Sequence, residues 1–331
     1  MTCSGTQSPT WAFDVVDACN KFDGNLDGMW KFCLLNNSTP VGYMTEEFAN
    51  QMDWTGTAFN VCKLQKRVHL NPALLPGDDG TESCNLELIK LCEINRSRFN
   101  GCFENWLWTK NCFHAIRWLD NRKPIFRMPT PLRGILGIAT AGVHFNVYTI
   151  IGDQPFMWIA RRSRSTTYPG MLDQIVAGAM DPKDTSPWST LQHEAWDEAG
   201  LVLDVHSANV THNDLPVGTV YGPSRISFYD KKDRSVGLEV GHLEPGVRFV
   251  FEMEVPPTFV PKPGTSDAVG GFILKSVAEV KKDLSEGKWK PNSGLTTLDF
   301  LVRKGYIADG GDGTVERLQA ALQRKLPMPT R

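Results

Sequence analysis

The acidic residues of the segment AGAMDPKDTSPWSTLQHEAWDEAGL, residues 177–201, have the types and spacing that could do chemistry. Glu194 and Glu198 are four residues apart, and Asp197 lies three residues after Glu194, so a helix would place all three carboxylates on one side. Three neighbouring carboxylates repel one another unless a cation lies among them, and Mg²⁺ prefers such oxygen ligands. A solvated acidic face has the same spacing, so the helix alone leaves both interpretations open.

Capping signals define the element that carries these acids. Ser186 suits a helix N-cap, Pro187 suits the first helical position, and Gly200 suits the end, so we expect a helix that runs to about Ala199. Alternating apolar residues predict strands around this helix, two of them paired across the Gly152-Asp153 turn. The strands are expected at 143–151, 156–160, 175–177, 248–255 and 272–277, and closing helices at 296–304 and 314–325.

The first part of the chain predicts a separate α+β domain. Its expected elements are a helix at 13–22, a hairpin of 29–35 and 41–43, a helix at 48–52 that starts at Thr45, a strand at 60–70 and a helix at 81–94. The aromatic residues Trp106, Trp108, Phe113 and Trp118 are typical of a core. The three prolines within 122–131 indicate a linker. We therefore expect an N-terminal domain over 1–126 and a second domain over 127–331.

Composition excludes several classes of function. The chain of 331 residues has a formal net charge of −2, so no overall field attracts nucleic acid or an anionic membrane. No run of about 18 apolar residues predicts a membrane span, and the first residues lack a secretory pattern, so we expect a cytoplasmic protein. All eight cysteines lie at or before Cys112 without a CxxC pair, which favours reduced, buried thiols over zinc ligands or disulfides. We expect a small-molecule partner, and the sequence leaves the oligomeric state open.

Residues 177–201 resemble the Nudix signature. That signature reads Gly, five residues, Glu, seven residues, then Arg-Glu-hydrophobic-x-Glu-Glu-x-Gly-hydrophobic. Glu194 matches the Glu of the Arg-Glu pair, Asp197 and Glu198 match the Glu-Glu pair, and Gly200-Leu201 match the end. In this family the helix acids hold Mg²⁺ against a diphosphate, and a metal-activated water attacks phosphorus. The resemblance therefore implies that Glu194 and Glu198 are metal ligands, with Asp197 in support.

The flanking segments resemble one branch of Nudix proteins. They are GVHFNVYTI (142–150), FMWIARRSRSTTYPGMLDQIVAG (156–178), RFVFEMEVPPTFVPKP (248–263), KWKPNSGLTTLDFLVRKGYI (288–307) and RLQAALQRKLPMPT (317–330). This branch carries an N-terminal domain of unknown function that is similar to the N-terminal half of fungal thiamine pyrophosphokinases, and its stand-alone relatives act on thiamine diphosphate analogues. The resemblance implies an α/β (α+β) protein: a Nudix α/β/α sandwich with a mixed sheet, preceded by the smaller α+β domain.

The box, residues 178–201, is degenerate compared with this signature. Ala179 replaces the first Gly, Thr185 the first Glu, and His193 the Arg that orients the box acids. Ala268 and Gly270 stand where relatives have further acidic residues. These five losses together indicate a relaxed demand for diphosphate hydrolysis.

Residues near the box are the candidates for substrate binding. The segment before the box lies near the ligand in relatives, and its arginines suit a phosphate or carboxylate, although surface arginines would look the same. Tryptophans in and near the box suit either an apolar pocket or the core. The predicted substrate-binding residues are Arg161, Arg162, Arg164, Tyr168, Trp188 and Trp196.

Three functions remain as hypotheses. The first is a repurposed Nudix-fold enzyme of specialised metabolism that isomerises, rearranges or cyclises a small apolar metabolite without metal or other cofactor, with His193, Glu194, Asp197 and Glu198 as catalytic acids, bases or hydrogen-bond donors. The second is an Mg²⁺-dependent hydrolase of a thiamine-diphosphate-like or other organic diphosphate. The third is a non-catalytic ligand-binding protein. The losses in the box favour the first.

Overall fold

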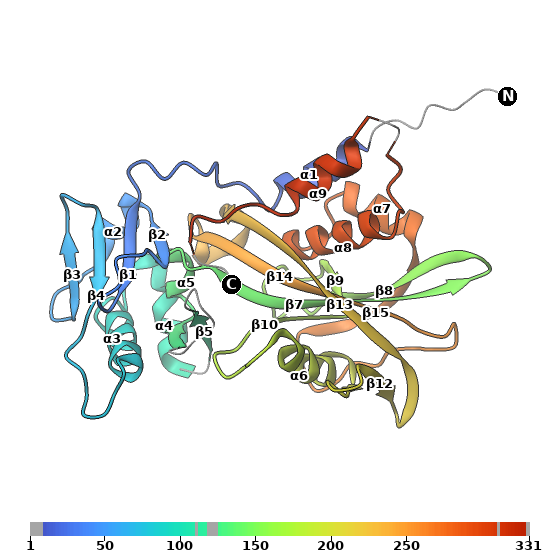
Figure 1. The fold of residues 1–331 in the computed structure, drawn as a ribbon, viewed down its shortest axis with the longest axis horizontal. Helices are drawn as coiled ribbons and strands as arrows, with labels where there is room; N and C mark the ends of the chain where they lie inside the picture. The colour runs from blue at the N-terminus through green and yellow to red at the C-terminus, as the bar shows by residue number, and fades with distance from the viewer. Residues whose placement is uncertain (1–8, 110–111, 118–124, 310–311, 329–331) are drawn as a thin grey trace.

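A nine-stranded mixed sheet forms the centre of the larger part of the molecule (Figure 1). The computed structural model describes residues 9–109, 112–117, 125–309 and 312–328. The main path of the sheet is β11-β12-β13-β14-β7-β8-β15, with β10 paired to β7 and β9 paired to β8. Strands β14 and β7 pair in parallel, whereas the other described strand pairs of this sheet are antiparallel. The strands are β7 (Thr140–Ile151), β8 (Gln154–Arg162), β9 (Leu172–Gln174), β10 (Val176–Ala179), β11 (Leu201–Leu203), β12 (Asn209–His212), β13 (Leu215–Lys231), β14 (Leu243–Glu254) and β15 (Val269–Ser276).

Helices cover both faces of this sheet. Successive side chains of a strand point to opposite faces, and β7 is buried on both. Its residues Val143, Phe145 and Val147 pack in one core with α6 (Pro187–Ala199), and Tyr148 packs in the core of the opposite face. That second core is covered by α1 (Thr10–Asp17), α7 (Val277–Ser285), α8 (Pro291–Arg303) and α9 (Thr314–Ala321) (Figure 1). The expected α/β/α arrangement with a mixed sheet is confirmed.

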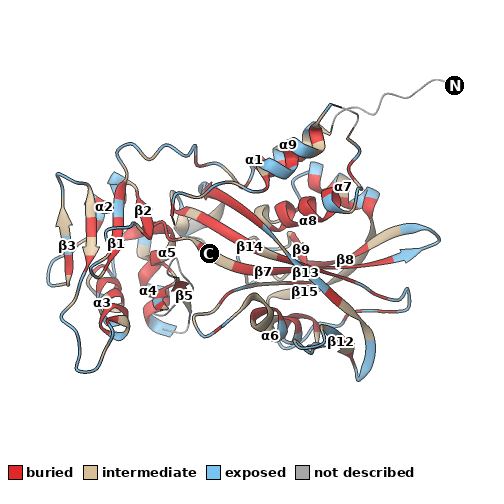
Figure 2. Ribbon diagram, viewed as in Figure 1, coloured by how far each residue is buried: buried red, intermediate tan, exposed pale blue. Residues whose placement is uncertain are grey.

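A smaller α+β unit lies beside the large sheet. Its four-stranded sheet has the order β2-β1-β4-β3, and a second hairpin pairs β5 with β6. Buried residues between Trp30 and Ile138 form one continuous core, and buried positions concentrate on the inner sides of its elements (Figure 2). The elements are β1 (Trp30–Leu34), β2 (Gly42–Met44), α2 (Glu46–Gln51), β3 (Phe59–Cys62), β4 (Arg67–Leu70), α3 (Thr81–Ile94), η1 (Phe99–Gly101), α4 (Cys102–Thr109), β5 (Phe113–Ile116), β6 (Phe126–Pro129) and α5 (Leu132–Ile135).

We call residues 30–138 the N-terminal unit. Its core begins and ends later in the chain than the domain of residues 1–126 that the sequence predicts. The preceding helix α1 instead buries Ala12, Val15 and Val16 against the helices that close the chain. The apolar residues of 126–138 complete the core of the unit, because they continue the β5–β6 hairpin into α5.

The structure confirms most of the elements that local sequence signals predict. The hairpin of β1 and β2, the helix α2 with Thr45 as its N-cap, and the helix α3 lie where the sequence predicts them. The single strand predicted at 60–70 is wrong: β3 and β4 form a hairpin in which Lys66 has a φ of 45°. The turn was missed because Lys63-Leu64-Gln65-Lys66 contains no glycine or proline.

The aromatic and cysteine residues of the first part of the chain differ in how far they are buried. Trp106 is buried and packs edge-on against Phe113, but Trp108 is 81% exposed and belongs to no core; Trp118 lies outside the described residues. The described cysteines are free thiols, and five of these seven are buried.

Within the described ranges, no helix has both the length and the apolar character needed to cross a bilayer.

Candidate functional site

The helix α6 is fixed at both ends by its own sequence. The hydroxyl of Ser186 accepts a hydrogen bond from the backbone N–H of Ser189 at 3.2 Å, and Pro187 occupies the first turn. Gly200 ends the helix with a φ of 62°, a conformation that glycine adopts without strain. These caps set the start and the end of the helix, and therefore the face on which its acids lie.

Two of the three box acids meet the strand β10. Glu198 is buried and accepts a hydrogen bond from the backbone N–H of Ala177 at 2.7 Å. Glu194 lies against Gly178, so closely that a Cβ on this glycine would be 2.1 Å from the carboxyl carbon. Asp197 instead accepts a hydrogen bond from the hydroxyl of Thr265 at 3.2 Å, in the segment after β14. The structure therefore brings Glu194 and Glu198 together and directs Asp197 away from β10.

Burial makes both carboxyls of this pair costly to ionise. Burial raises the pKa of Glu198 to about 8, against the hydrogen bond from Ala177, and the charge of Glu194 raises it further. Burial also raises the pKa of Glu194, with His193 acting against it and Asp197 adding to it. In the described part of the chain, neither carboxylate forms an ion pair with Lys or Arg, and the closest base is His193, whose Nε2 lies 3.7 Å from Glu194.

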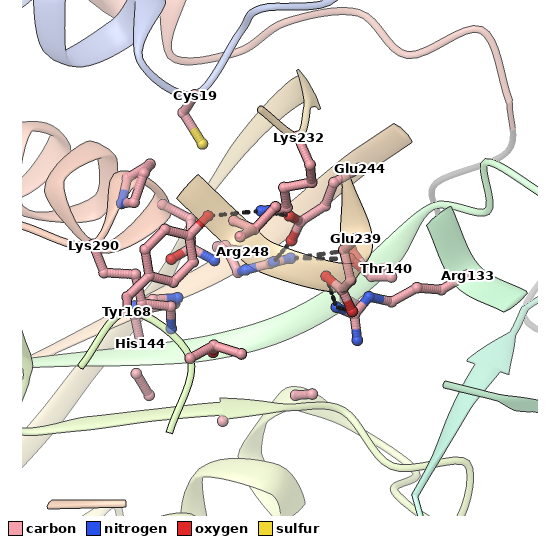
Figure 3. A pocket seen from close by; sticks show the side chains of 18 of the residues that line it. Cys19, Arg133, Thr140, His144, Tyr168, Lys232, Glu239, Glu244, Arg248 and Lys290 are labelled. Atoms are coloured by element: carbon pink, nitrogen blue, oxygen red, sulfur yellow. Dashed lines mark hydrogen bonds and ion pairs between the residues drawn. The ribbon is translucent and has the colours of Figure 1, made fainter. Parts of the chain in front are cut away.

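A cavity of ≈ 260 Å³ opens beside β10 (Figure 3). Its floor includes Ala177, Gly178 and Ala179 of β10, and the first two of these residues contact Glu198 and Glu194, respectively. Its walls come from β7, from the start of α8, from β14 and the segment between β13 and β14, from the loop before β9, and from the N-terminal unit. Cationic residues outnumber acidic ones among the lining side chains, which include Arg133, Lys232, Arg248, Lys290, Glu239 and Glu244.

Ion pairs hold the charged residues of the cavity in place. Glu244 pairs with Lys232 and, at 3.1 Å, with Arg248, and Lys232 also donates to the hydroxyl of Tyr168 at 3.2 Å. Burial alone would raise the pKa of Glu244, but Lys232 and Arg248 hold it at about 2. Lys290, at the N-cap of α8, lies 3.3 Å from the buried Asp173. The cavity therefore presents fixed charges of both signs.

The two histidines of the cavity are neutral. Burial lowers the pKa of His144 and of His114 to about 3 in each case, and neighbouring cations act in the same direction. His144 of β7 contacts the amide oxygen of Gln174 at 2.6 Å. This contact orients its ring beside α8, because Gln174 also donates to Thr297 of that helix.

The other predicted site residues lie at different distances from the cavity. Tyr168 lines it. The guanidinium of Arg162 pairs with Asp173 at 2.8 Å, and that of Arg161 donates to a backbone carbonyl at 3.0 Å; neither lines the cavity, nor does the exposed Arg164. Trp188 of α6 packs against Phe251 of β14, and Trp196 of the same helix is 53% exposed. The side chains that line the cavity are therefore mostly not those near the box in sequence.

Sequence reasoning missed most of the charged lining. Arg248 and Lys290 lie in the segments 248–263 and 288–307, whose resemblance to Nudix proteins was a usable signal. Arg133 lies next to the predicted linker, and Lys232, Glu239 and Glu244 lie in a stretch without a motif. Only the folded arrangement brings these residues to one cavity.

Comparison with known proteins shows the family of this chain. No protein-family model matches the chain. Nudix hydrolase 20, chloroplastic, of Arabidopsis thaliana is 30% identical over 327 residues, which cover 95% of this chain and 78% of that protein. Nudix hydrolase 24, chloroplastic, of the same plant is 27% identical, covering 93% of this chain and 76% of that protein. An α/β/α sandwich with a capped acidic helix beside a charged cavity defines a Nudix-type protein, and the chain belongs to the Nudix family.

Other matches are shorter or weaker. The uncharacterized protein YJR142W of Saccharomyces cerevisiae is 31% identical over 213 residues, so the match spans 63% of this chain and 60% of the yeast protein. A crystal structure of a C. elegans Ap4A hydrolase binary complex has a TM-score of 0.33 and 9% identity, covering 50% of this chain and 98% of that chain. The Nudix domain of Shewanella oneidensis NrtR with ADP ribose has a TM-score of 0.31 and 12% identity, covering 43% and 75%. Superpositions this weak carry no argument about fold or ligand.

Proposed function

We propose that this chain is a Nudix-fold enzyme that hydrolyses a small organic diphosphate with the help of a divalent cation. The observation that supports this proposal is the cavity, which has an excess of cationic side chains and whose floor strand β10 also contacts Glu194 and Glu198. A diphosphate needs positive charge around its oxygens, and the cavity offers it. An apolar metabolite would remove water from these ion pairs without adding a polar partner, and such desolvation of charged groups is costly. The charged lining therefore favours hydrolysis over the metal-independent rearrangement that the degenerate box suggests.

The two carboxylates Glu194 and Glu198 are a small set of protein ligands for a divalent cation. Within the described residues, no group of three or more His, Cys, Asp or Glu side chains is arranged to hold a metal ion. Mg²⁺ often keeps several waters and is held by one or two carboxylates together with substrate phosphates. Glu194 and Glu198 would be its protein ligands, and burial raises the pKa of both carboxyls. When bound, the cation supplies charge neutralisation and an activated water.

The residues of the chain have separate parts in this reaction. Lys290 and Arg248 lie on the cavity wall and would bind and orient the phosphates. Asp173 holds the ammonium group of Lys290 in place, and Glu244 holds the guanidinium group of Arg248. With a volume of ≈ 260 Å³, the cavity fits a small metabolite better than a dinucleotide, since pockets for drug-sized ligands have about 300–1,000 Å³.

A metal-independent isomerase or cyclase is the second candidate. The observation in its favour is the composition of the box: Thr185 and His193 stand at the positions of Glu and Arg, and Asp197 is turned to Thr265. In this case Glu198, whose pKa burial raises to about 8, would act as a general acid at neutral pH, and burial raises the pKa of Glu194 in the same direction. Metal dependence separates the two candidates.

The test uses the purified full chain and a panel of organic diphosphates. We expect phosphate release in Mg²⁺ or Mn²⁺ that stops in EDTA and falls about 100-fold or more in Glu198→Gln, because a charged ligand is lost. Glu254→Gln, which changes an exposed glutamate of β14, is the matched control and should leave turnover unchanged. Equal turnover in EDTA, or conversion of a compound without phosphate release, would support the isomerase instead.

A further inference from the structure

We propose that the N-terminal unit is the specificity element of this cavity, and that Arg133, held by Glu239, recognises the part of the substrate that is not phosphate. The inference rests on the proposed hydrolysis of an organic diphosphate and names the residues that would choose among such compounds. It starts from two contributions of the unit to the lining: His114 of β5 and Arg133 of α5.

The Arg133–Glu239 pair is a rigid part of the wall. Nη2 of Arg133 donates to both carboxylate oxygens of Glu239, at 2.7 and 2.8 Å, and Nη1 lies 3.4 Å from Nε2 of His114. Glu239 belongs to the short 3₁₀ helix η2 (Arg234–Glu239) between β13 and β14. The pair therefore joins the N-terminal unit to the large sheet at the cavity.

Close packing around this ion pair fixes the position of α5. A Cβ on Gly134 would lie 2.6 Å from the Cβ of His242, so α5 approaches the start of β14 as closely as a glycine allows. His242 also packs edge-on against Phe48 of α2, with ring centroids 5.4 Å apart. These contacts fix the backbone of α5, and the two hydrogen bonds to Glu239 hold the guanidinium of Arg133 in one place, which is a requirement for selecting a ligand by shape.

The cavity has two chemically different ends (Figure 3). Lys290 and His144 lie at one end, near Ala177 and therefore near Glu198, whose charge Lys290 partly offsets. Arg133 and Glu239 lie at the other end, with Arg248 and Lys232 between the two. The Lys290 end suits a diphosphate, so the remainder of the substrate extends toward the Arg133 end.

The Arg133 end predicts the chemistry of that remainder. The ion pair has no net charge, so it does not favour a further anion. The guanidinium keeps unused N–H donors and Glu239 keeps unused acceptor positions, so the end suits a polar, uncharged group with both donors and acceptors, such as a heterocycle or a polyol. An apolar tail would leave these groups desolvated without partners, and such a mismatch discriminates strongly.

The N-terminal unit also contacts the box itself. Nη2 of Arg117 donates to the backbone carbonyls of Asp181, at 3.2 Å, and Asp184, at 3.0 Å. The carboxylate of Asp184 in turn accepts from the hydroxyl of Thr190 in α6 at 2.7 Å. The unit is therefore connected to the loop that leads into the acidic helix, as expected for an integral part of the site.

The experiment compares Arg133→Met with two other variants on the full chain. The probes are ADP-ribose and thiamine diphosphate, which have polar groups, dimethylallyl diphosphate, which has an apolar tail, and inorganic pyrophosphate, which has no such remainder. We expect Arg133→Met to raise KM for the polar compounds about 10- to 100-fold, with kcat nearly unchanged, and to leave pyrophosphate inhibition unchanged. Lys290→Met should weaken pyrophosphate inhibition. Arg127→Met, an exposed arginine of β6, is the matched control for the loss of charge.

The outcomes separate this inference from the proposed function. A uniform loss on all four probes, or no change on any of them, would overturn the inference while hydrolysis itself stands. If no diphosphate is hydrolysed, the proposed function fails, and calorimetric binding of the same probes decides the inference. A 10- to 100-fold weaker binding of the polar compounds to Arg133→Met would then support it. Equal affinity, or no binding to either protein, would overturn it. Arg133→Met alone leaves the carboxylate of Glu239 without its partner. The double variant Arg133→Met/Glu239→Gln removes that charge, so the same loss of affinity in both variants would come from lost recognition by Arg133.

Discussion

Among single residues, Glu198 has a carboxyl whose ionised form is destabilised by burial in the folded protein. Burial raises its pKa to about 8, above the ordinary value of 4.5, and the charge of Glu194 adds to the effect. The hydrogen bond from Ala177 compensates only in part. A carboxyl that is expensive to ionise without a cation is well suited to bind one.

Glu198 also predicts how stability changes with pH. Between pH 4.5 and 8 the native protein keeps a proton on this carboxyl that the unfolded chain has released, so the free energy of unfolding decreases as pH rises. The slope from this one group is at most about 1.4 kcal/mol per pH unit. In Glu198→Gln the slope disappears, and we expect the variant to be more stable than the native sequence at pH 8 in EDTA. Urea denaturation at pH 5, 6.5 and 8 measures this difference.

The control for this prediction is the cation. Mg²⁺ with inorganic pyrophosphate should stabilise the native sequence more at pH 8 than at pH 6, because binding requires the ionised carboxylate. The same addition should have little effect on Glu198→Gln. A native sequence that is more stable than the variant at pH 8 without cation would contradict the account of Glu198 as a strained acid.

Among the elements, the close approach of β10 to α6 is what brings two acids against the strand that forms the cavity floor. Gly178 leaves room for the carboxyl of Glu194, whose carbon would be 2.1 Å from a Cβ at that position. The obstructing atoms are the far end of a flexible side chain, so the fold can accommodate an added methyl group by moving Glu194. The glycine therefore determines where the acid lies.

Gly178→Ala tests this arrangement. We expect phosphate release to fall about 10- to 100-fold while the free energy of unfolding changes by less than about 1 kcal/mol, because Glu194 moves and the core does not. A double-mutant cycle with Glu194→Ala measures the coupling: Gly178→Ala should have no further effect once Glu194 is absent. Additive losses in the double variant would mean that the glycine acts through something other than Glu194.

Elements with local signals could be predicted from the sequence, and those defined by pairing could not. The bounds of α6 follow from Ser186, Pro187 and Gly200, since capping depends on neighbours in the chain. Strands β11 to β13 were missed, because β13 is long and exposed along much of its first half and shows no clear alternation. The acids at 194, 197 and 198 could be found from their spacing, but the turn of Asp197 toward Thr265 depends on a loop 68 residues away.

The charged cavity was beyond sequence reasoning for a physical reason. Its cations are 42 to 157 residues away from one another along the chain, counted between Lys290, Arg248 and Arg133, and no spacing rule connects them. Each is fixed by a tertiary ion pair, such as Arg133 with Glu239. The sequence could therefore predict the family and the acids, but not which side chains face the ligand.

At the scale of the whole molecule, α1 connects the two ends of the chain. Its buried residues Val15 and Val16 pack in the core of α7, α8 and α9, although α7, the first of these helices, begins 260 positions after the end of α1. The chain then continues through Cys19, which lines the cavity, before it enters the N-terminal unit. Contacts from α1 thus support the large sheet, the cavity wall and the path to the unit.

Val16→Ala measures how much of the stability depends on this connection. The side chain is 5% exposed, and its truncation removes two buried methyl groups, so we expect the free energy of unfolding to fall by about 2 kcal/mol. Asp14→Ala changes an exposed residue of the same helix and should cost less than about 0.5 kcal/mol. If α1 is an integral part of the core, circular dichroism and tryptophan fluorescence should show the same shift in the unfolding midpoint. A stability equal to that of Asp14→Ala would mean that the helix only covers a core that is complete without it.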